Sequence, residues 1–119
     1  MNNYNLIISP WFKKDIQIKN PTINDIKKSI NLIKEAEFII LDIEPALNNR
    51  VTFIQATNYD KAFDMIDAEI QVIDGTDCNL INYGKRLSFE NFMNLLENFL
   101  NGNVPNITDW EYVGTFGTI

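Results

Sequence analysis

The sequence contains no histidine and one cysteine, Cys78, among its 119 residues. Without histidine, the chain cannot build the Cys-His sets of zinc fingers or the Ser-His and Cys-His pairs of many hydrolases. A single thiol cannot form an internal disulfide, so the fold has to be held together by its core alone. We therefore expect a protein that is not an enzyme and that uses no metal ion and no cofactor.

Long apolar runs and clustered positive charge are also missing. The longest apolar runs, such as 38–41, are too short to span a bilayer, and the first four residues lack the features of a secretory signal. The net charge is −6, whereas a nucleic-acid binder needs clustered lysine and arginine to neutralise phosphates. We expect a cytoplasmic chain that binds neither membrane nor nucleic acid, and any charged partner to be basic.

The size and composition are those of one globular domain covering 1–119. Apolar residues make up 45% of the chain and aromatic residues 12%, which is enough for a core. A domain of this length buries roughly two-thirds of its unfolded surface. No internal repeat or linker divides it. Nothing in the pattern requires self-association, so we expect a monomer or a weak dimer.

Two segments have the periodicity of amphipathic helices. Thr22 and Asp25 form a capping-box pattern ahead of 23–35, where isoleucines recur at helical spacing. Ser88 precedes a wider apolar face, and Asn101-Gly102 marks the end of that helix. The apolar residues of this second helix are Phe89, Phe92, Met93, Leu96, Phe99 and Leu100.

The remaining apolar segments are short and rich in β-branched or aromatic residues, as strands are. They are 5–9, 15–19, 38–43, 51–56, a long stretch within 61–74, 79–83 and 109–113. We place a turn at 58–60 and expect the tail after 113 to be loose. Runs of strands between isolated helices favour an α+β fold, with an antiparallel or mixed β-sheet and two amphipathic helices packed against it.

Negative charge is concentrated in the segment 60–77. This segment contains six acidic residues and one lysine, so it carries most of the net charge of the chain. An acidic surface speeds the encounter with a basic partner and accepts hydrogen bonds from its arginine and lysine side chains. The alternative is a solubilising surface or a protected edge strand. The predicted partner-binding residues are Asp60, Asp64, Asp67, Glu69, Asp74 and Asp77.

Other polar and aromatic residues have simpler explanations. The pairs Asp42/Glu44 and Asp67/Glu69 would each share one face of a strand and could in principle act as acid and base, but no nucleophile accompanies them. Large rings in a small domain usually complete the core, although they could form a binding platform. The aromatic residues concerned are Trp11, Tyr59, Tyr83, Trp110 and Tyr112.

The C-terminal third contains LSFENF at 87–92, FLNGNVPN at 99–106 and Trp110-Glu111. This stretch resembles the first-numbered immunity-protein family of bacterial polymorphic toxin systems, in which a helix ending in Phe-x-x-Gly is followed by proline and a Trp-Glu-like strand. By this resemblance, Phe99, Gly102, Pro105 and Trp110 occupy the characteristic positions of the family. Physically they are an apolar anchor, a helix stop, a rigid turn and a buried indole.

The resemblance implies a small α+β protein, encoded beside a secreted toxin, which it binds and inactivates. Toxins of these systems include nucleases and deaminases with basic substrate clefts, which an acidic surface would suit. Two alternatives remain open: a cytosolic interaction or adaptor domain without a toxin partner, and a small enzyme that uses carboxylates alone.

Overall fold

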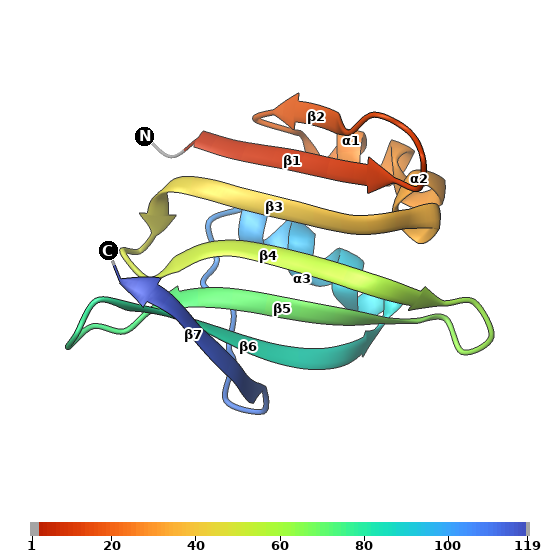
Figure 1. Cartoon of the computed structure of the whole chain (residues 1–119). Coiled ribbons are helices and arrows are strands. Elements are labelled where there is room, and N and C mark those ends of the chain that lie inside the picture. The colour runs from red at the N-terminus through yellow and green to blue at the C-terminus, as the bar shows by residue number, and fades with distance from the viewer. Residues whose placement is uncertain (1–2, 119) are drawn as a thin grey trace.

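Seven strands of the computed structural model, which describes residues 3–118, form one antiparallel sheet (Figure 1). Its order is β2-β1-β3-β4-β5-β6-β7, so β3 to β7 follow one another in sequence and in space, while β1 lies between β2 and β3. The strands are β1 (Asn3–Pro10), β2 (Ile16–Lys19), β3 (Ala36–Leu47), β4 (Val51–Asp60), β5 (Met65–Ile73), β6 (Asn79–Ser88) and β7 (Glu111–Thr118).

The first predicted helix is two short helices, α1 (Ile23–Lys28) and α2 (Ile30–Glu35). Its start is confirmed, because Thr22 Oγ1 accepts a hydrogen bond from the Asp25 amide at 3.1 Å and Asp25 Oδ2 accepts one from the Thr22 amide at 2.8 Å. The prediction of one continuous helix is wrong. The Ser29 hydroxyl donates to the Asp25 carbonyl at 2.8 Å, a local bond that competes with helical hydrogen bonding where the two helices meet.

The second predicted helix is α3 (Phe89–Leu100), and both of its ends are confirmed. Ser88 Oγ accepts from the Asn91 amide at 3.1 Å and so satisfies one of the amides of the first turn. Gly102 has φ +84°, the left-handed conformation with which many helices end, and its amide donates to the Phe99 carbonyl at 3.0 Å.

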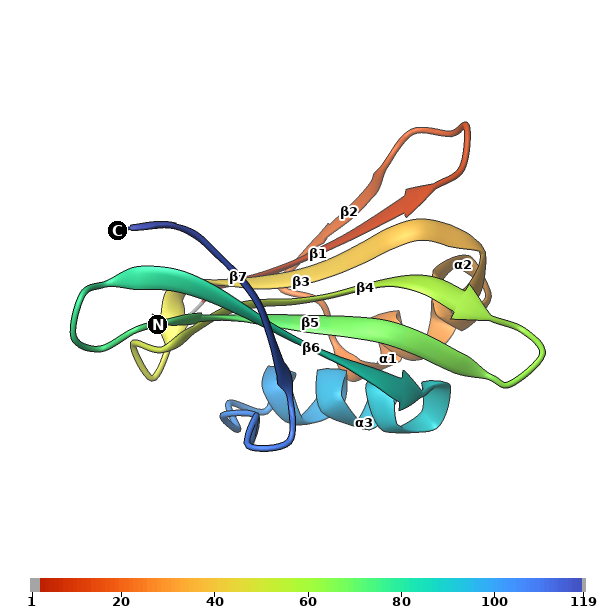
Figure 2. The same cartoon turned by 60° about the horizontal axis from the view of Figure 1, so that its bottom comes forward.

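The helices lie on one side of the sheet (Figure 2). Alternate residues of β5 are buried, and so are Phe92, Leu96 and Phe99 of α3, all three with no exposed surface. These side chains share one core with the isoleucines of α1 and α2. The chain is thus α+β with a dominant antiparallel sheet. No helix within 3–118 is long and apolar enough to cross a membrane.

The predicted turn at 58–60 is wrong, because β4 runs on to Asp60, which pairs with Met65. Asn58 has φ 56° and marks an irregularity in the register between Thr57 and Asp60. The local preference of Asn58 for a left-handed conformation is therefore accommodated as a bulge within a hairpin. The chain turns only between β4 and β5.

The C-terminal tail is not loose over the residues described, because β7 extends to Thr118. Its backbone pairs with β6 as far as Asn79, and this pairing outweighs the weak strand preference of Gly114 and Gly117. Two register shifts interrupt the pairing, so β7 is an irregular edge strand.

The expectation that the five aromatic residues complete the core is wrong for two of them. Trp11 is 56% exposed because it lies in the turn between β1 and β2, beyond the paired residues. Tyr112 is 61% exposed because it belongs to the edge strand β7. Tyr59, Tyr83 and Trp110 do pack, partly buried, against the core.

Candidate functional site

The candidate site is the sheet face that points away from the helices (Figure 2). Side chains alternate between the two faces of a strand, so the residues between the buried positions of each strand lie here. We call this surface the open face. One row across it, identified by the strand registers, is Gln17, Ile7, Ile40, Gln55, Glu69, Gly84 and Glu111.

Part of the open face is apolar. In β3, Phe38 and Ile40 alternate with the fully buried Ile39 and Leu41, and each of the first two is only partly exposed. Ile7 pairs with Ile40 in the register of β1 and β3 and is partly buried too. Within residues 3–118 the helices cover the other face, so these side chains form a floor that is available to a partner.

A chain of side-chain hydrogen bonds crosses β4, β5 and β6 beside this floor. Thr52 Oγ1 donates to Gln71 Oε1 at 2.8 Å, and Gln71 Nε2 donates to Asn82 Oδ1 at 3.0 Å. Asn82, which is 4% exposed, donates through Nδ2 to Glu69 Oε1 at 3.2 Å. The chain ends on the Glu69 carboxylate and orients it. None of the ion pairs found within 3–118 involves Glu69.

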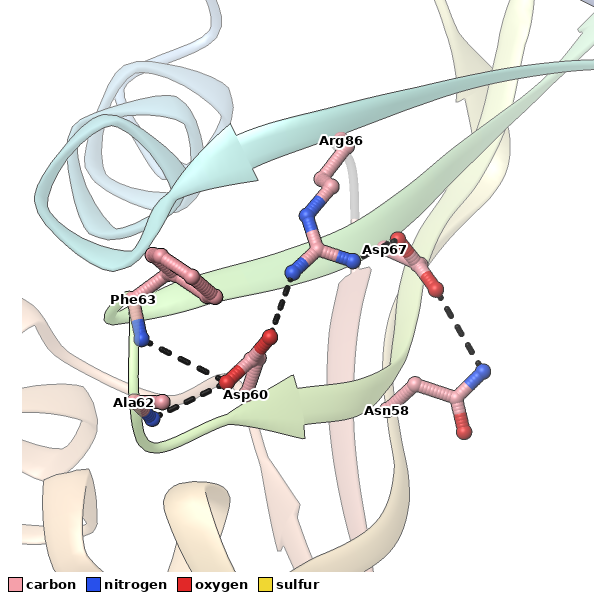
Figure 3. Close-up of polar contacts among 6 residues, drawn as sticks. All are labelled: Asn58, Asp60, Ala62, Phe63, Asp67 and Arg86. Carbon is pink, nitrogen blue, oxygen red and sulfur yellow. Dashed lines mark hydrogen bonds and ion pairs between the residues drawn. The ribbon is translucent and has the colours of Figure 1, made fainter.

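Arg86 of β6 lies between two of the predicted partner-binding residues (Figure 3). Its Nη2 is 2.7 Å from Asp60 Oδ2, and its Nη1 is 3.9 Å from Asp67 Oδ1. The other oxygen of Asp67 accepts from Asn58 Nδ2 at 3.3 Å. The guanidinium group therefore connects β6 to the end of β4 and to β5. Its single positive charge offsets part of the negative charge of the two carboxylates.

The Asp60 carboxylate also organises the turn between β4 and β5. Its Oδ1 accepts from the amides of Ala62 and Phe63 at 2.9 and 3.4 Å (Figure 3). Partial burial works to raise the pKa of Asp60, but the bonds from Arg86 and from these two amides outweigh it and hold the pKa below its ordinary value. Asp60 is therefore a structural anion as well as a surface charge.

Asp64 points to a different part of the molecule. It accepts a short hydrogen bond from the Tyr59 hydroxyl, and its Oδ1 is 3.7 Å from Nζ of Lys34 on α2. The same Nζ lies 4.8 Å from the centre of the Phe89 ring, a cation–π distance. The bond to Asp64 raises the pKa of Tyr59, because it favours the protonated hydroxyl. Asp64 thus connects the β4–β5 turn to the helices.

Asp74 and Asp77 lie in the turn between β5 and β6, at the opposite end of β5 from Asp60 and Asp64. Asp74 Oδ1 accepts from the Thr76 amide at 3.0 Å, as in many tight turns. At about 3.3 Å per residue, β5 separates the two ends by roughly 26 Å. The six acidic residues are thus distributed over the two ends and the middle of a hairpin, with Asp67 and Glu69 on the open face.

A hollow of about 500 Å³ opens beside Glu69, at the junction of β5, β6 and β7. Gly84 forms its floor, since a Cβ there would lie 3.0 Å from Val113 Cγ2 and 3.6 Å from Glu69 Cγ. Val113 is the extra residue of a β7 bulge, which directs its side chain over Gly84. The charged residues lining the hollow are Asp67, Glu69, Lys85, Arg86, Asp109 and Glu111.

Sequence reasoning missed most of this hollow. Glu69, Gly84 and Glu111 lie on three different strands, and only the strand registers bring them together. The available signal was Gly84 directly after a predicted strand, because an isolated glycine in a strand indicates a bulge or a close approach.

A second hollow of about 400 Å³ lies at the β1, β2 and β3 end of the sheet. Asp42, Glu44 and Lys19 are among the residues that line it. Burial raises the pKa of Asp42, and the nearby Glu44 charge adds to the rise, whereas a hydrogen bond with Asn5 opposes it. The Asp42 carboxyl group thus protonates more easily than an ordinary aspartate.

None of the four positions that carry the family resemblance is among the residues that line either hollow. Phe99 is fully buried, its ring meets that of Tyr4 edge-on at 5.5 Å, and its carbonyl accepts from the Tyr4 hydroxyl at 2.6 Å. Gly102 ends α3, Pro105 follows in the loop, and Trp110 packs partly buried against the core. These contacts hold α3 and its following loop against the sheet.

Residues 3–118 contain no group of three or more acidic, cysteine or histidine side chains placed to share a metal ion. The open face instead offers carboxylates, amides and apolar side chains. Such a set can bind a surface by hydrogen bonds, ion pairs and apolar contact.

Comparison with known proteins adds evidence on the fold. No protein-family model and no curated protein matches the chain. A crystal structure of a hypothetical protein from Neisseria gonorrhoeae is similar, with a TM-score of 0.51 and 14% identity over 88% of this chain and 90% of that one. Similarity at that identity concerns the fold alone, so the α+β architecture recurs along nearly the full length of another protein.

Proposed function

We propose that this chain is an immunity protein of the bacterial cytoplasm that binds and neutralises a cognate toxin through its open face, without catalysing a reaction. The toxin is a nuclease or deaminase, whose cleft the open face would occlude. The observation that carries the proposal is a sheet with helices on one side and, on the other, apolar side chains interspersed with oriented carboxylates.

The extent of the open face suits a protein partner. The two longer principal extents of the chain are 39 and 30 Å. A face of that size can supply the roughly 800 Å² per partner that a stable interface buries. Phe38, Ile40 and Ile7 would form the apolar centre of such an interface, and the polar residues of β5 and β6 would lie beside it.

Charge favours a basic partner. The chain has a net charge of −6, and the hollow beside Glu69 is lined by four acidic and two basic side chains. Arg86 is already engaged by Asp60 and Asp67, so Glu69 and Glu111 are the acceptors best placed for a lysine or arginine of the partner. The hydrogen bond from Asn82 holds Glu69 in position before the partner arrives.

The first test is co-expression of the chain with the toxin domain encoded beside its gene, scored by cell survival and by co-purification of a complex. Survival together with a stoichiometric complex is expected. Continued killing with no complex would contradict the immunity role.

A matched pair of variants then tests the assigned surface. Glu69→Lys with Glu111→Lys changes the open face, whereas Asp74→Lys with Asp77→Lys makes the same change of charge in the β5–β6 turn. If the open face binds the toxin, the first pair weakens the complex more than the second. Equal loss in both would indicate that overall charge, and not this face, determines binding.

The competing role is an interaction or adaptor domain whose partner is not a toxin. The open face would serve that role equally well. A neighbouring gene without a toxin domain would favour it.

A further inference from the structure

The turn between β1 and β2 presents two aromatic side chains to solvent. Phe12 is 102% exposed and Trp11 is 56% exposed, and their ring centres are 6.3 Å apart. A tryptophan and a phenylalanine together at a hairpin tip form an apolar knob. Isolated exposed apolar residues are common, but an adjacent pair of large rings with this exposure is typical of an interaction site.

The backbone of Phe12 is also unusual. Its φ is 59°, in the left-handed region that is strained for a residue with a bulky side chain. Within 3–118, the other non-glycine residues with positive φ are asparagines, one aspartate and one cysteine, and most of these tolerate that conformation well. A phenylalanine held in strain and in full contact with water contributes nothing evident to folding, which points to a role outside the free chain.

The tip lies on the same side of the sheet as the open face. Figure 2 shows the β1–β2 turn raised away from the helices, on the side opposite α3. The strand that leads to it, β1, also contributes Ile7 to the apolar floor. The Trp11 side chain also lines a hollow with Leu32 and Glu35 of α2, at the end of the sheet. A partner seated on the open face would therefore meet this turn at the edge of its footprint.

The local charge of the tip differs from that of the rest of the open face. Lys13 and Lys14 follow the two aromatic residues and Asp15 comes next, so the turn carries two positive charges and one negative charge. All three side chains are exposed, and none of them takes part in the ion pairs found within 3–118. The hollow beside Glu69, in contrast, has an acidic excess. The complementary partner is thus basic where it faces that hollow and acidic where it faces the tip.

We infer that Trp11 and Phe12 insert into an apolar socket bordered by carboxylates on the surface of the toxin, and that Lys13 and Lys14 pair with those carboxylates. This inference rests on the proposed immunity function and specifies how the partner is held. Buried aromatic anchors carry a large share of the binding energy in many interfaces. An anionic membrane is disfavoured as the target by the net charge of −6.

The test is the substitution Phe12→Asn, which removes the ring and places a residue that accepts the left-handed conformation. The dissociation constant for the co-purified toxin domain is expected to rise by at least about 30-fold, the loss typical of a hot spot. The melting temperature of the free chain is expected to stay the same or rise. Val104→Asn is the control, since Val104 is 41% exposed in the loop after α3, and it should leave binding unchanged.

The outcomes separate the inference from the function on which it rests. If the native chain binds the toxin and Phe12→Asn binds it equally well, the inference is overturned and the immunity role stands. If the native chain does not bind the toxin, the proposed function fails and the inference fails with it. The free chain could instead bind phosphatidylserine vesicles, and Phe12→Asn could abolish that binding. This result would overturn the inference that the two rings enter a socket on the toxin, and would identify a membrane as their target.

Discussion

Replacing Phe99 by alanine should unfold the chain much more easily than replacing Phe12, although both remove one phenyl ring. Phe99 is fully buried between α3 and the sheet, where its ring meets Tyr4 edge-on, whereas Phe12 is fully exposed. Burial of about 150 Å² at about 25 cal/mol per Å² corresponds to about 4 kcal/mol. Measured costs for such core substitutions are about 3–5 kcal/mol.

The assay is urea unfolding followed by far-ultraviolet circular dichroism, with the free energy of unfolding taken from the midpoint and slope. We expect Phe99→Ala to lose about 4 kcal/mol, a large fraction of the roughly 5–15 kcal/mol of a typical domain. Phe12→Ala should change the free energy by no more than about 0.5 kcal/mol. A loss below about 1 kcal/mol for Phe99→Ala would mean that α3 does not pack on the sheet as described.

Two further perturbations test local features. Hydrogen bonds from Thr22 hold the pKa of Asp25 below its ordinary value, and hydrogen bonds from Arg86 and two backbone amides do the same for Asp60. Each ionised carboxylate therefore stabilises the folded state fully above about pH 4, which is the pKa of an aspartate in the unfolded chain. This stabilisation is lost as the pH falls through the lower pKa of the folded state. A variant carrying Asp25→Asn and Asp60→Asn should show a shallower loss of melting temperature below pH 4, and an unchanged slope would refute these contacts. Gly102→Ala should cost about 1 kcal/mol in urea unfolding because φ is +84° there, and a neutral result would argue against the left-handed helix end.

The elements that could be predicted from the sequence are those specified by nearby residues. The capping box of Thr22 and Asp25 and the pattern from Ser88 to Gly102 each lie within a single segment, and both were located correctly. The break at Ser29 was missed because the isoleucine periodicity continues across it, and the side-chain hydrogen bond that accompanies the break is not visible in that pattern.

The site depends on contacts that are distant in sequence. Asp67 and Glu69 were identified as acidic strand residues, but the compensation of Asp67 by Arg86 follows from the register of β5 and β6. Gly84 and Val113 come together only because β7 returns to the edge of β6 with a bulge. Composition revealed the amount of negative charge, and only the fold shows how it is distributed.

The most direct test of the partner-binding face is a substitution at its centre. Gln55 lies between Ile40 and Glu69 on the open face, while Asn98 is exposed on α3 on the other side of the molecule. Gln55→Arg and Asn98→Arg add the same charge and the same side chain, so their affinities for the toxin domain can be compared directly. If the open face is the interface, Gln55→Arg weakens the complex by about 100-fold, because it buries a charge that has no matching partner. The melting temperature of this variant stays unchanged, and Asn98→Arg binds the toxin domain as the native chain does. Native affinity in Gln55→Arg, or equal loss in both variants, would contradict the account.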